Sequence, residues 1–185
     1  WYYLDGNNTD IVGIMVKDTV MKIGNQYYCF DAEGIMQSSG WISRSEGWYY
    51  ADARGALITG WKDIRGTWYY FDGNGQLVNG WKSIGGKWYF FNYDYRMISD
   101  GWYNINGVEY YFLSSGAMAD GWAKVNGEWY YCPGGKEYNG WLSSGGNWYY
   151  ISESQMVYGG IYIIDNRYYS FANNGVWLGY ANPPQ

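Results

Sequence analysis

The stretch that decides the fold is GWKDIRGTWYYFDGNGQL, residues 60–77, because its pattern recurs along the chain. A Gly-Trp pair opens the unit, a second Trp follows seven residues later, and an apolar residue stands nine positions after that. The opening Trp recurs at intervals of 20, 20, 21, 20 and 19 residues, at Trp41, Trp61, Trp81, Trp102, Trp122 and Trp141. Self-similarity at a short fixed period is typical of a repeat array in which each unit packs against its neighbours.

Each repeat is predicted to form a β-hairpin. Residues 61–64 and 68–71 are short runs rich in strand-forming residues, and the turn dipeptide Arg65-Gly66 separates them. Equivalent positions carry Gly or Asn, which accept the positive φ of a tight turn: Gly85-Gly86, Asn106-Gly107, Asn126-Gly127 and Gly145-Gly146. Because no stretch shows sustained helical periodicity, we expect an all-β chain with loops such as 72–75 between hairpins.

A single hairpin of this size is marginal in water, so the repeats must stack. Side chains alternate along a strand, which puts Trp68 and Tyr70 on one face and Tyr69 and Phe71 on the other. Both faces are aromatic, so one packs against the adjoining hairpin and part of the other stays accessible. The sequence therefore predicts a solenoid of tandem hairpins with aromatic grooves at the junctions.

The whole chain, residues 1–185, is interpreted as a single repeat module. Regular repeats fill about residues 40–159, and degenerate units flank them at about 1–39 and 160–185. Atypical end units are expected, because the outermost repeat has no neighbour on one side. The chain opens in the middle of a repeat, at Trp1, so we expect a fragment or a processed form whose signal peptide lies outside it.

Composition favours a binding surface. Aromatic residues make up 23% of the chain, with 13 Trp and 24 Tyr, and exposed aromatic clusters usually mark interaction sites. The net charge of -5 and the lack of a basic run argue against a nucleic-acid partner and suit a cationic ligand. No apolar run approaches the roughly 20 residues that a spanning helix needs, so we expect no membrane insertion.

The residue types argue against catalysis. The chain has no His, which removes the commonest general base and the Ser-His and Cys-His pairs. Cys29 and Cys132 lie too far apart for a Cys-x-x-Cys metal site, and we expect both to be reduced and partly buried, with a long-range disulfide as the alternative. We therefore expect no enzyme, no cofactor and no metal here, although a catalytic domain could exist elsewhere in the full-length protein.

The repeat pattern Gly-Trp-x-x-x-x-Gly-x-Trp-Tyr-Tyr-Phe-Asp-x-x-Gly-x-Met/Leu resembles the choline-binding, or cell-wall-binding, repeats of Gram-positive bacteria and their phages. The resemblance extends from about Gly13 to Leu178, and the best units start at Gly40, Gly60, Gly80, Gly121 and Gly140. It implies a superhelix of stacked hairpins on an extracellular, cell-wall-associated protein. It also implies multivalent binding of choline or phosphocholine on teichoic acids.

The resemblance further implies an aromatic cage at each junction, made of two aromatic residues of one hairpin and one of the next, with Met or Leu nearby. Carried onto this chain, the cages are Trp41 and Trp48 with Tyr69 and Leu57, Trp61 and Trp68 with Tyr89 and Leu77, Trp81 and Trp88 with Tyr110 and Met97, Trp122 and Trp129 with Tyr149, and Trp141 and Trp148 with Tyr169 and Val157. The choice of Tyr within each run stays open, with Tyr70 and Phe90 as alternatives.

Three departures from the pattern predict fewer working cages than repeats. Glu109 stands where the second Trp is expected, so the cage of Trp102 lacks a wall. The segment 93–96 lacks the usual loop Gly, which predicts a distorted junction, and Tyr138 replaces Met or Leu.

Two alternatives to choline binding remain. Glucan-binding repeats of streptococcal glucosyltransferases look similar, and Asp72, Asn74 and Gln76 are candidates for bonding sugar hydroxyls. The other alternative is a surface adhesin scaffold whose cages have decayed.

Overall fold

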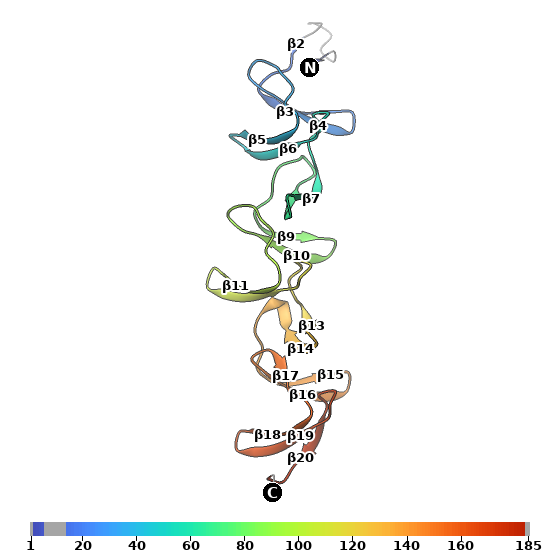
Figure 1. Ribbon diagram of the computed structural model, residues 1–185, viewed down its shortest axis with the longest axis vertical. Coiled ribbons are helices and arrows are strands. Elements are labelled where there is room, and N and C mark those ends of the chain that lie inside the picture. Colours follow the sequence, from blue (N-terminus) through green and yellow to red (C-terminus); the bar gives the residue numbers. More distant parts are fainter. Residues whose placement is uncertain (1, 6–13, 184–185) are drawn as a thin grey trace. The chain divides into compact units, whose positions relative to one another are not determined.

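The computed structural model describes residues 2–5 and 14–183, and these residues form strands, turns and one short 3-10 helix, η1 (Pro133–Gly135) (Figure 1). Trp1 and Gly13, which open the chain and the predicted resemblance, lie outside the described residues. Within the described residues, no helix is long and apolar enough to cross a membrane. The predicted all-β class is confirmed.

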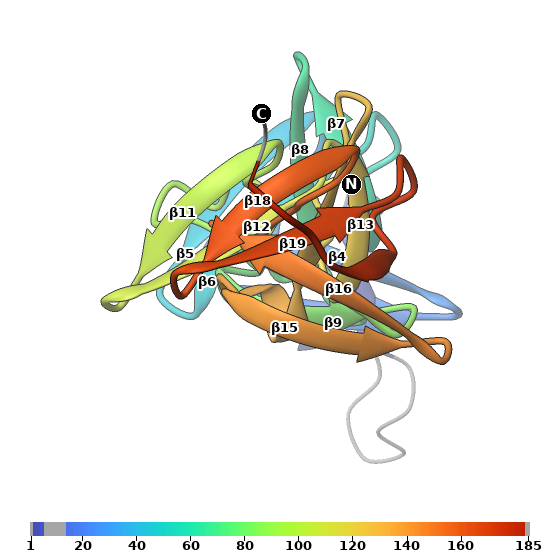
Figure 2. The ribbon, with the colours of Figure 1, turned by 90° about the horizontal axis from the view of Figure 1, so that it is seen from below.

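The strands pair mostly as two-stranded antiparallel hairpins, one per repeat (Figure 2). The first half of the chain contains β1 (Leu4–Asp5) with β2 (Ile14–Met15), β3 (Thr19–Ile23) with β4 (Gln26–Phe30), β5 (Gly40–Arg44) with β6 (Gly47–Ala51), β7 (Gly60–Ile64) with β8 (Thr67–Phe71), and β9 (Gly80–Ile84) with β10 (Lys87–Phe91). The second half contains β11 (Gly101–Ile105) with β12 (Val108–Phe112), and β18 (Gly160–Ile164) with β19 (Arg167–Phe171) and β20 (Trp177–Tyr180). Between them lies one five-stranded sheet in the order β13 (Gly121–Val125), β14 (Glu128–Cys132), β17 (Gln155–Met156), β16 (Asn147–Ser152) and β15 (Gly140–Ser144).

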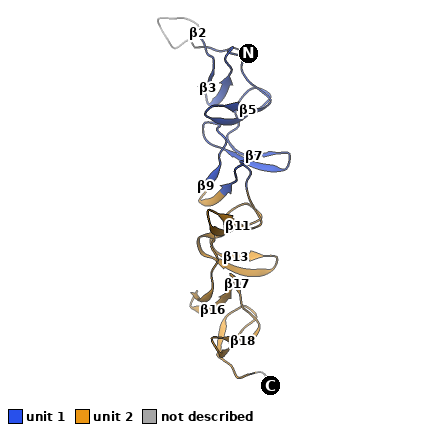
Figure 3. Ribbon diagram, turned by 90° about the vertical axis from the view of Figure 1, so that its left-hand side faces the viewer, with its two compact units in different colours: residues 1–82, 90–97 blue, residues 83–89, 98–185 orange. Residues whose placement is uncertain are grey.

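The chain divides into two compact units (Figure 3). Unit 1 comprises residues 1–82 and 90–97, and unit 2 comprises residues 83–89 and 98–185. The boundary falls inside the β9–β10 repeat. The interpretation of residues 1–185 as a single module stays a prediction.

Hairpin register follows the turn chemistry of the sequence. In the β7–β8 hairpin Trp61 pairs with Tyr70 and Asp63 pairs with Trp68. The two residues between the strands, Arg65 and Gly66, have φ of 57° and 79°. Positive φ at both central residues gives a turn whose twist matches that of the strands. The predicted hairpins and their two-residue turns are confirmed.

Consecutive hairpins within a unit are joined by the loop that follows each hairpin. The loop after β8 returns at Leu77, which bridges to Phe71 of its own hairpin and donates its backbone N–H to the Trp48 carbonyl of the preceding hairpin at 2.8 Å. In unit 2 Met118 donates in the same way to the Trp88 carbonyl at 2.7 Å. Each loop therefore ties two neighbouring repeats together, which is the local packing that a solenoid requires.

The core is a series of small clusters. Phe30, Phe71, Phe91, Phe112 and Ile151 are almost fully buried at the ends of the second strands of their hairpins. Removing one such apolar side chain from water stabilises its repeat by roughly 1.5–3 kcal/mol.

The two cysteines are free and buried, as the sequence predicts for reduced residues, and no disulfide joins them. Cys132 occupies the strand-end position that Phe takes in other repeats. Burial raises the pKa of the Cys132 thiol from 9.0 to about 11, because the charged form loses hydration. The thiol therefore stays protonated at neutral pH and behaves as a small apolar side chain.

Candidate functional site

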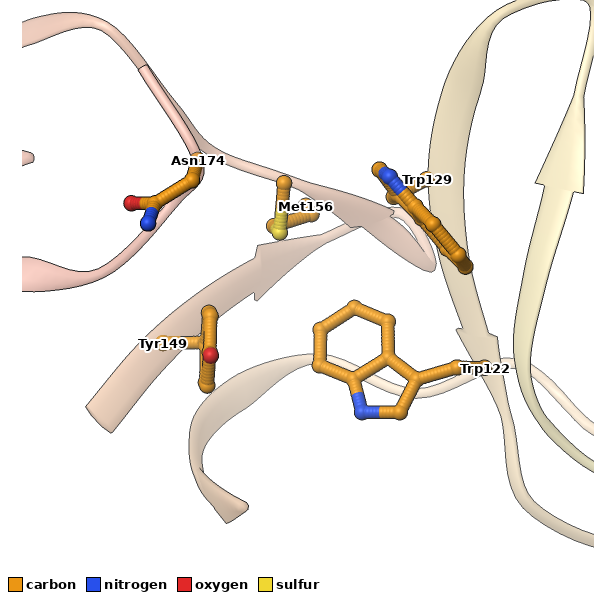
Figure 4. Close-up of a pocket in the computed structure, with 5 residues that line it drawn as sticks. All are labelled: Trp122, Trp129, Tyr149, Met156 and Asn174. Atoms are coloured by element: carbon orange, nitrogen blue, oxygen red, sulfur yellow. The ribbon is translucent and has the colours of Figure 1, made fainter. Parts of the chain in front are cut away.

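An aromatic hollow of about 350 Å³ opens in unit 2. Trp122 of β13 and Trp129 of β14 stand almost perpendicular, with ring centroids 6.2 Å apart at 89°. Tyr149 of β16 closes a third side, 5.2 Å from the Trp122 ring. Figure 4 shows these rings and Met156 around an open space, with Asn174 at its edge.

Strand alternation explains why these rings meet. Trp122 pairs directly with Tyr131, and Trp129 lies two residues before Tyr131, so both Trp share one face of the β13–β14 hairpin. Tyr149 follows Trp148 in sequence, so it lies on the other face of the β15–β16 hairpin from Trp148. This face is turned toward the preceding repeat, where Tyr149 contacts Trp122. A junction therefore joins the Trp face of one hairpin to the first Tyr of the next.

A second hollow of about 430 Å³ lies in unit 1 and repeats this construction. The rings of Trp41 and Trp48 are 6.4 Å apart at 86°, and Tyr69 lies 5.1 Å from Trp41. Leu77 takes the position that Met156 has in unit 2, and Asp94 and Tyr95 complete the lining. Two hollows with the same geometry indicate that the site belongs to the repeat.

The second Trp of a repeat keeps much of its surface in water. Relative exposure is 40% for Trp48, 41% for Trp129 and 48% for Trp148. The rings are therefore more than core, since large aromatic side chains that serve packing alone are largely covered. The Lys124 ammonium lies 5.8 Å from the centroid of the Trp129 ring, a cation–π distance.

The structure brings together two of the five predicted triads around a hollow, those of Trp41, Trp48 and Tyr69 and of Trp122, Trp129 and Tyr149. In both, the first Tyr of the run lines the site. The alternative, the second Tyr, packs on its own hairpin, as Tyr70 does at 5.2 Å from Trp61.

The other three triads are placed only in part. Trp61 lies 6.2 Å from Trp68 in unit 1, and Trp81 lies 5.2 Å from Phe90 in the same unit. Tyr89, Trp88 and Tyr110 belong to unit 2, so closure of the cages of Trp61 and Trp81 stays a prediction. Trp141 lies 5.0 Å from Tyr169, and Trp148 is on the strand paired with that of Trp141.

The predicted apolar neighbours are wrong by one repeat. The sequence assigns Leu57 to Trp41 and Trp48, but Leu77 lines that hollow. Leu57 instead packs with Cys29, Ile42 and Tyr49 at the junction before it. The reason is that each loop folds back over the preceding hairpin, so the apolar residue reaches the cage of the repeat before its own.

The same shift applies further along the chain. Met97, predicted to serve Trp81 and Trp88, donates its backbone N–H to the Trp68 carbonyl at 3.0 Å. Val157, predicted to serve Trp141, gives the apolar place to Met156, because four residues separate Ile151 from Met156 where five separate Phe71 from Leu77. Met156 pairs with Ile151 as Leu77 bridges to Phe71, and it lines the hollow of Trp122. At the last junction Trp177 pairs with Phe171 in the equivalent position, 5.6 Å from Trp141.

Sequence reasoning missed the loop residues Asp94, Tyr95 and Asn174, which come from the hairpin two repeats after the Trp pair. The nearest sequence signal is the absent Gly in 93–96, which predicts a distorted junction. The loop itself keeps the usual turn, and the distortion of the junction after it stays a prediction. Tyr95 N–H bonds the Asn92 carbonyl at 2.8 Å, as Gly75 N–H bonds the Asp72 carbonyl at 3.0 Å.

The β11–β12 repeat departs from the cage geometry at the position that the sequence indicates. Glu109 accepts a hydrogen bond from Asn104 Nδ2 of its own hairpin at 2.8 Å and provides no aromatic wall beside Trp102. Tyr138, the residue in the Met or Leu place, has its backbone N–H bonded to Ser154 Oγ at 3.0 Å. Whether this junction binds a ligand stays a prediction.

Comparisons with known proteins agree on one kind of repeat. The model of the choline-binding repeat matches residues 58–94 and 99–133, and that of the cell wall binding repeat matches residues 39–57 and 139–154. No curated protein matches the chain.

Solved structures with the same fold include three from Streptococcus pneumoniae. Choline binding protein F is 31% identical with a TM-score of 0.68, over 89% of this chain and 58% of that one. The choline-binding domain of CbpL is 29% identical with a TM-score of 0.66, over 98% and 94% of the two chains. CbpJ is 26% identical with a TM-score of 0.69, over 96% and 69%. This chain thus spans little more than half the length of choline binding protein F.

Proposed function

This chain belongs to the choline-binding repeat family, and from that premise we propose that it attaches a protein to a bacterial cell wall by binding choline groups in its aromatic hollows. The observation that carries the proposal is the pair of hollows with two perpendicular Trp rings, a Tyr ring and an apolar side chain. We call the hollow of unit 1 (Trp41, Trp48, Tyr69, Leu77, Asp94, Tyr95) cage 1 and the hollow of unit 2 (Trp122, Trp129, Tyr149, Met156, Asn174) cage 2.

The chemistry of the cages fits a quaternary ammonium. Such a cation has no N–H to donate, so the negative faces of aromatic rings and apolar contact with its methyl groups are what hold it. Each ring that faces the cation contributes about 0.5–2 kcal/mol, and proteins in general recognise choline in this way. The net charge of -5 favours a cation over an anion at the surface.

Several weak cages acting together would give useful attachment. Three rings at these energies bind one headgroup with an affinity on the order of millimolar. A polymer that carries many choline groups, such as a teichoic acid, engages several cages at once, and each further contact is intramolecular. Repetition of the cage along the chain supports this multivalent mode.

The repeats are a binding module, and we propose that they perform no chemistry themselves. Two residue types that commonly act as nucleophile or base, His and thiolate Cys, are missing or blocked. The chain has no His, and both thiols are buried with raised pKa values, so that neither is a thiolate at neutral pH.

The alternative of glucan binding relies on loop side chains that already have partners. Asp72 Oδ1 accepts the backbone N–H groups of Asn74 and Gln76 at 2.8 and 2.9 Å. Asn74 Oδ1 accepts the Tyr27 hydroxyl at 2.8 Å, and Gln76 donates to the Glu46 carbonyl. These side chains hold loops, which leaves them poorly disposed to bond sugar hydroxyls.

Titration with choline chloride tests the proposal, followed by tryptophan fluorescence and by thermal melting. Sodium chloride at equal ionic strength and dextran are the controls. We expect a saturable fluorescence change and a higher melting temperature with choline alone, because a ligand that binds only the folded state stabilises it. A response to dextran without one to choline would replace the proposal by glucan binding.

A further inference from the structure

Cages 1 and 2 share their Trp and Tyr walls but differ in one loop, which comes from the hairpin two repeats later. Cage 1 has Asp94 and Tyr95 where cage 2 has Asn174 and Gly175. The two loops are equivalent, because Tyr95 N–H bonds the Asn92 carbonyl at 2.8 Å and Gly175 N–H bonds the Ala172 carbonyl at 2.9 Å. The two cages therefore differ in two loop residues that are held on equivalent backbones.

Tyr95 occupies a position that favours glycine. Its φ is 62°, and the equivalent Gly55, Gly75 and Gly175 have φ of 86°, 83° and 81°. A Cβ added to Gly175 would lie 2.7 Å from the Met156 Cε, so this position is also crowded by the apolar residue of the cage. A bulky residue held in the left-handed region is strained and is often kept for a functional reason.

The strained conformation directs Tyr95 into the lining of cage 1. Tyr95 is partly buried and lines the hollow together with Leu77. Asp94 is exposed and lines the same hollow with a carboxylate, where cage 2 has the neutral amide of Asn174. Cage 1 thus has one more aromatic ring and one more negative charge than cage 2.

We propose that Tyr95 and Asp94 make cage 1 the tighter site for a quaternary ammonium cation, with Tyr95 as an added wall and Asp94 as its counter-charge. This inference rests on the proposed choline binding. An added ring strengthens a site about two- to thirtyfold at 0.5–2 kcal/mol. An exposed counter-charge adds up to about fivefold at low salt, and that part weakens as salt screens it.

The test uses the whole chain, with the two cages as reporters in one sample. The indole N–H resonances of Trp48 and Trp129 are followed by nuclear magnetic resonance during titration with choline chloride at low and high sodium chloride. The neutral carbon isostere 3,3-dimethylbutan-1-ol serves as the uncharged probe. We expect Trp48 to saturate at lower choline concentration than Trp129, and the gap to narrow at high salt.

Three variants separate ring from charge. Asp94→Asn lowers the affinity reported by Trp48 for choline up to about fivefold and leaves that for the neutral isostere unchanged. Tyr95→Gly lowers the affinity for choline about two- to thirtyfold without lowering the melting temperature, because Gly accepts the positive φ. Asn174→Asp, the matched exchange in cage 2, raises the affinity reported by Trp129.

The outcomes distinguish the two proposals. Equal affinities at Trp48 and Trp129, or a Trp48 response that neither variant of the loop changes, would overturn the inference while choline binding stands. If neither indole responds to choline, the proposed function fails and the inference fails with it.

Discussion

The β13–β14 and β11–β12 hairpins have the same register between their own two strands, yet only the first has a second Trp that lines a hollow. Trp122 pairs with Tyr131 in the first as Trp102 pairs with Tyr111 in the second. The second hairpin keeps its register although Glu109 replaces the second Trp. The hairpin therefore does not require an aromatic residue at that position, which supports a role for the second Trp in binding a ligand.

What the two hairpins share is burial at the end of the second strand. Phe112 and Cys132 are both 0% exposed there, while Trp129 is 41% exposed. Two sets of residues are thus separated along one strand: strand-end residues that stabilise the fold and exposed Trp residues that line the cage. This separation can be tested by substituting one set at a time.

The largest effect is expected for Phe71→Ala. Phe71 is 0% exposed, so the substitution leaves a cavity that destabilises its repeat by about 3–5 kcal/mol. Thermal and denaturant unfolding followed by circular dichroism would measure the loss. Trp68→Ala is the matched control, three residues away and 46% exposed, and should lose far less stability. Equal losses would contradict the separation of fold and ligand residues.

The next effect concerns the ligand. Trp129→Ala removes one wall of cage 2, and we expect the choline affinity reported by the Trp122 indole to fall about tenfold or more, with little change in melting temperature. The Trp48 indole in cage 1 is the internal control and should titrate as in the unsubstituted chain. Unfolding of the hairpin with unchanged choline affinity would assign Trp129 to the core.

A smaller effect is expected for Glu109→Trp, which makes the β11–β12 hairpin resemble β13–β14. The new ring restores a wall beside Trp102, so calorimetry with choline should show one additional weak site. The site stays weak because the residue in the Met or Leu place is Tyr138, whose ring packs 5.3 Å from Tyr131 and whose hydroxyl donates to the Trp141 carbonyl at 2.7 Å. An unchanged stoichiometry would count against the view that Glu109 is what disables this junction.

The smallest effect is a pH dependence of stability caused by Cys132, which occupies the strand-end position of the β13–β14 hairpin. The pKa of the Cys132 thiol is raised to about 11 in the folded chain from 9.0, so stability from this group is complete below pH 9 and is lost as pH rises toward 11. Cys132→Ala should therefore show a shallower decline of melting temperature between pH 9 and 11. Identical slopes for the two proteins would show that the thiol does not titrate in this way.

The sequence predicts the local parts of this structure well. Turn dipeptides such as Arg65-Gly66 and the alternation of Trp68 with Tyr69 determine the hairpins and the faces, and these determine the triad of Trp41, Trp48 and Tyr69. Such features depend on neighbouring residues in the chain, for which strand geometry is a sufficient guide.

The parts that sequence reasoning missed depend on how a loop folds back. Leu77 serves the cage of the preceding repeat, and Asp94 reaches the cage two repeats before its own. The stretch from Ile151 to Met156 is one residue shorter than that from Phe71 to Leu77, so Met156, and not Val157, is the apolar residue that folds back. A fixed sequence offset cannot show which junction a returning loop covers, because that depends on backbone hydrogen bonds between repeats.

The most direct test of the central claim is a crystal structure of the chain soaked with choline chloride. The account predicts a trimethylammonium group in cage 2, with its nitrogen within about 6 Å of the ring centroids of Trp122, Trp129 and Tyr149. Choline bound elsewhere on the surface, with the hollow between these rings holding only water, would contradict it.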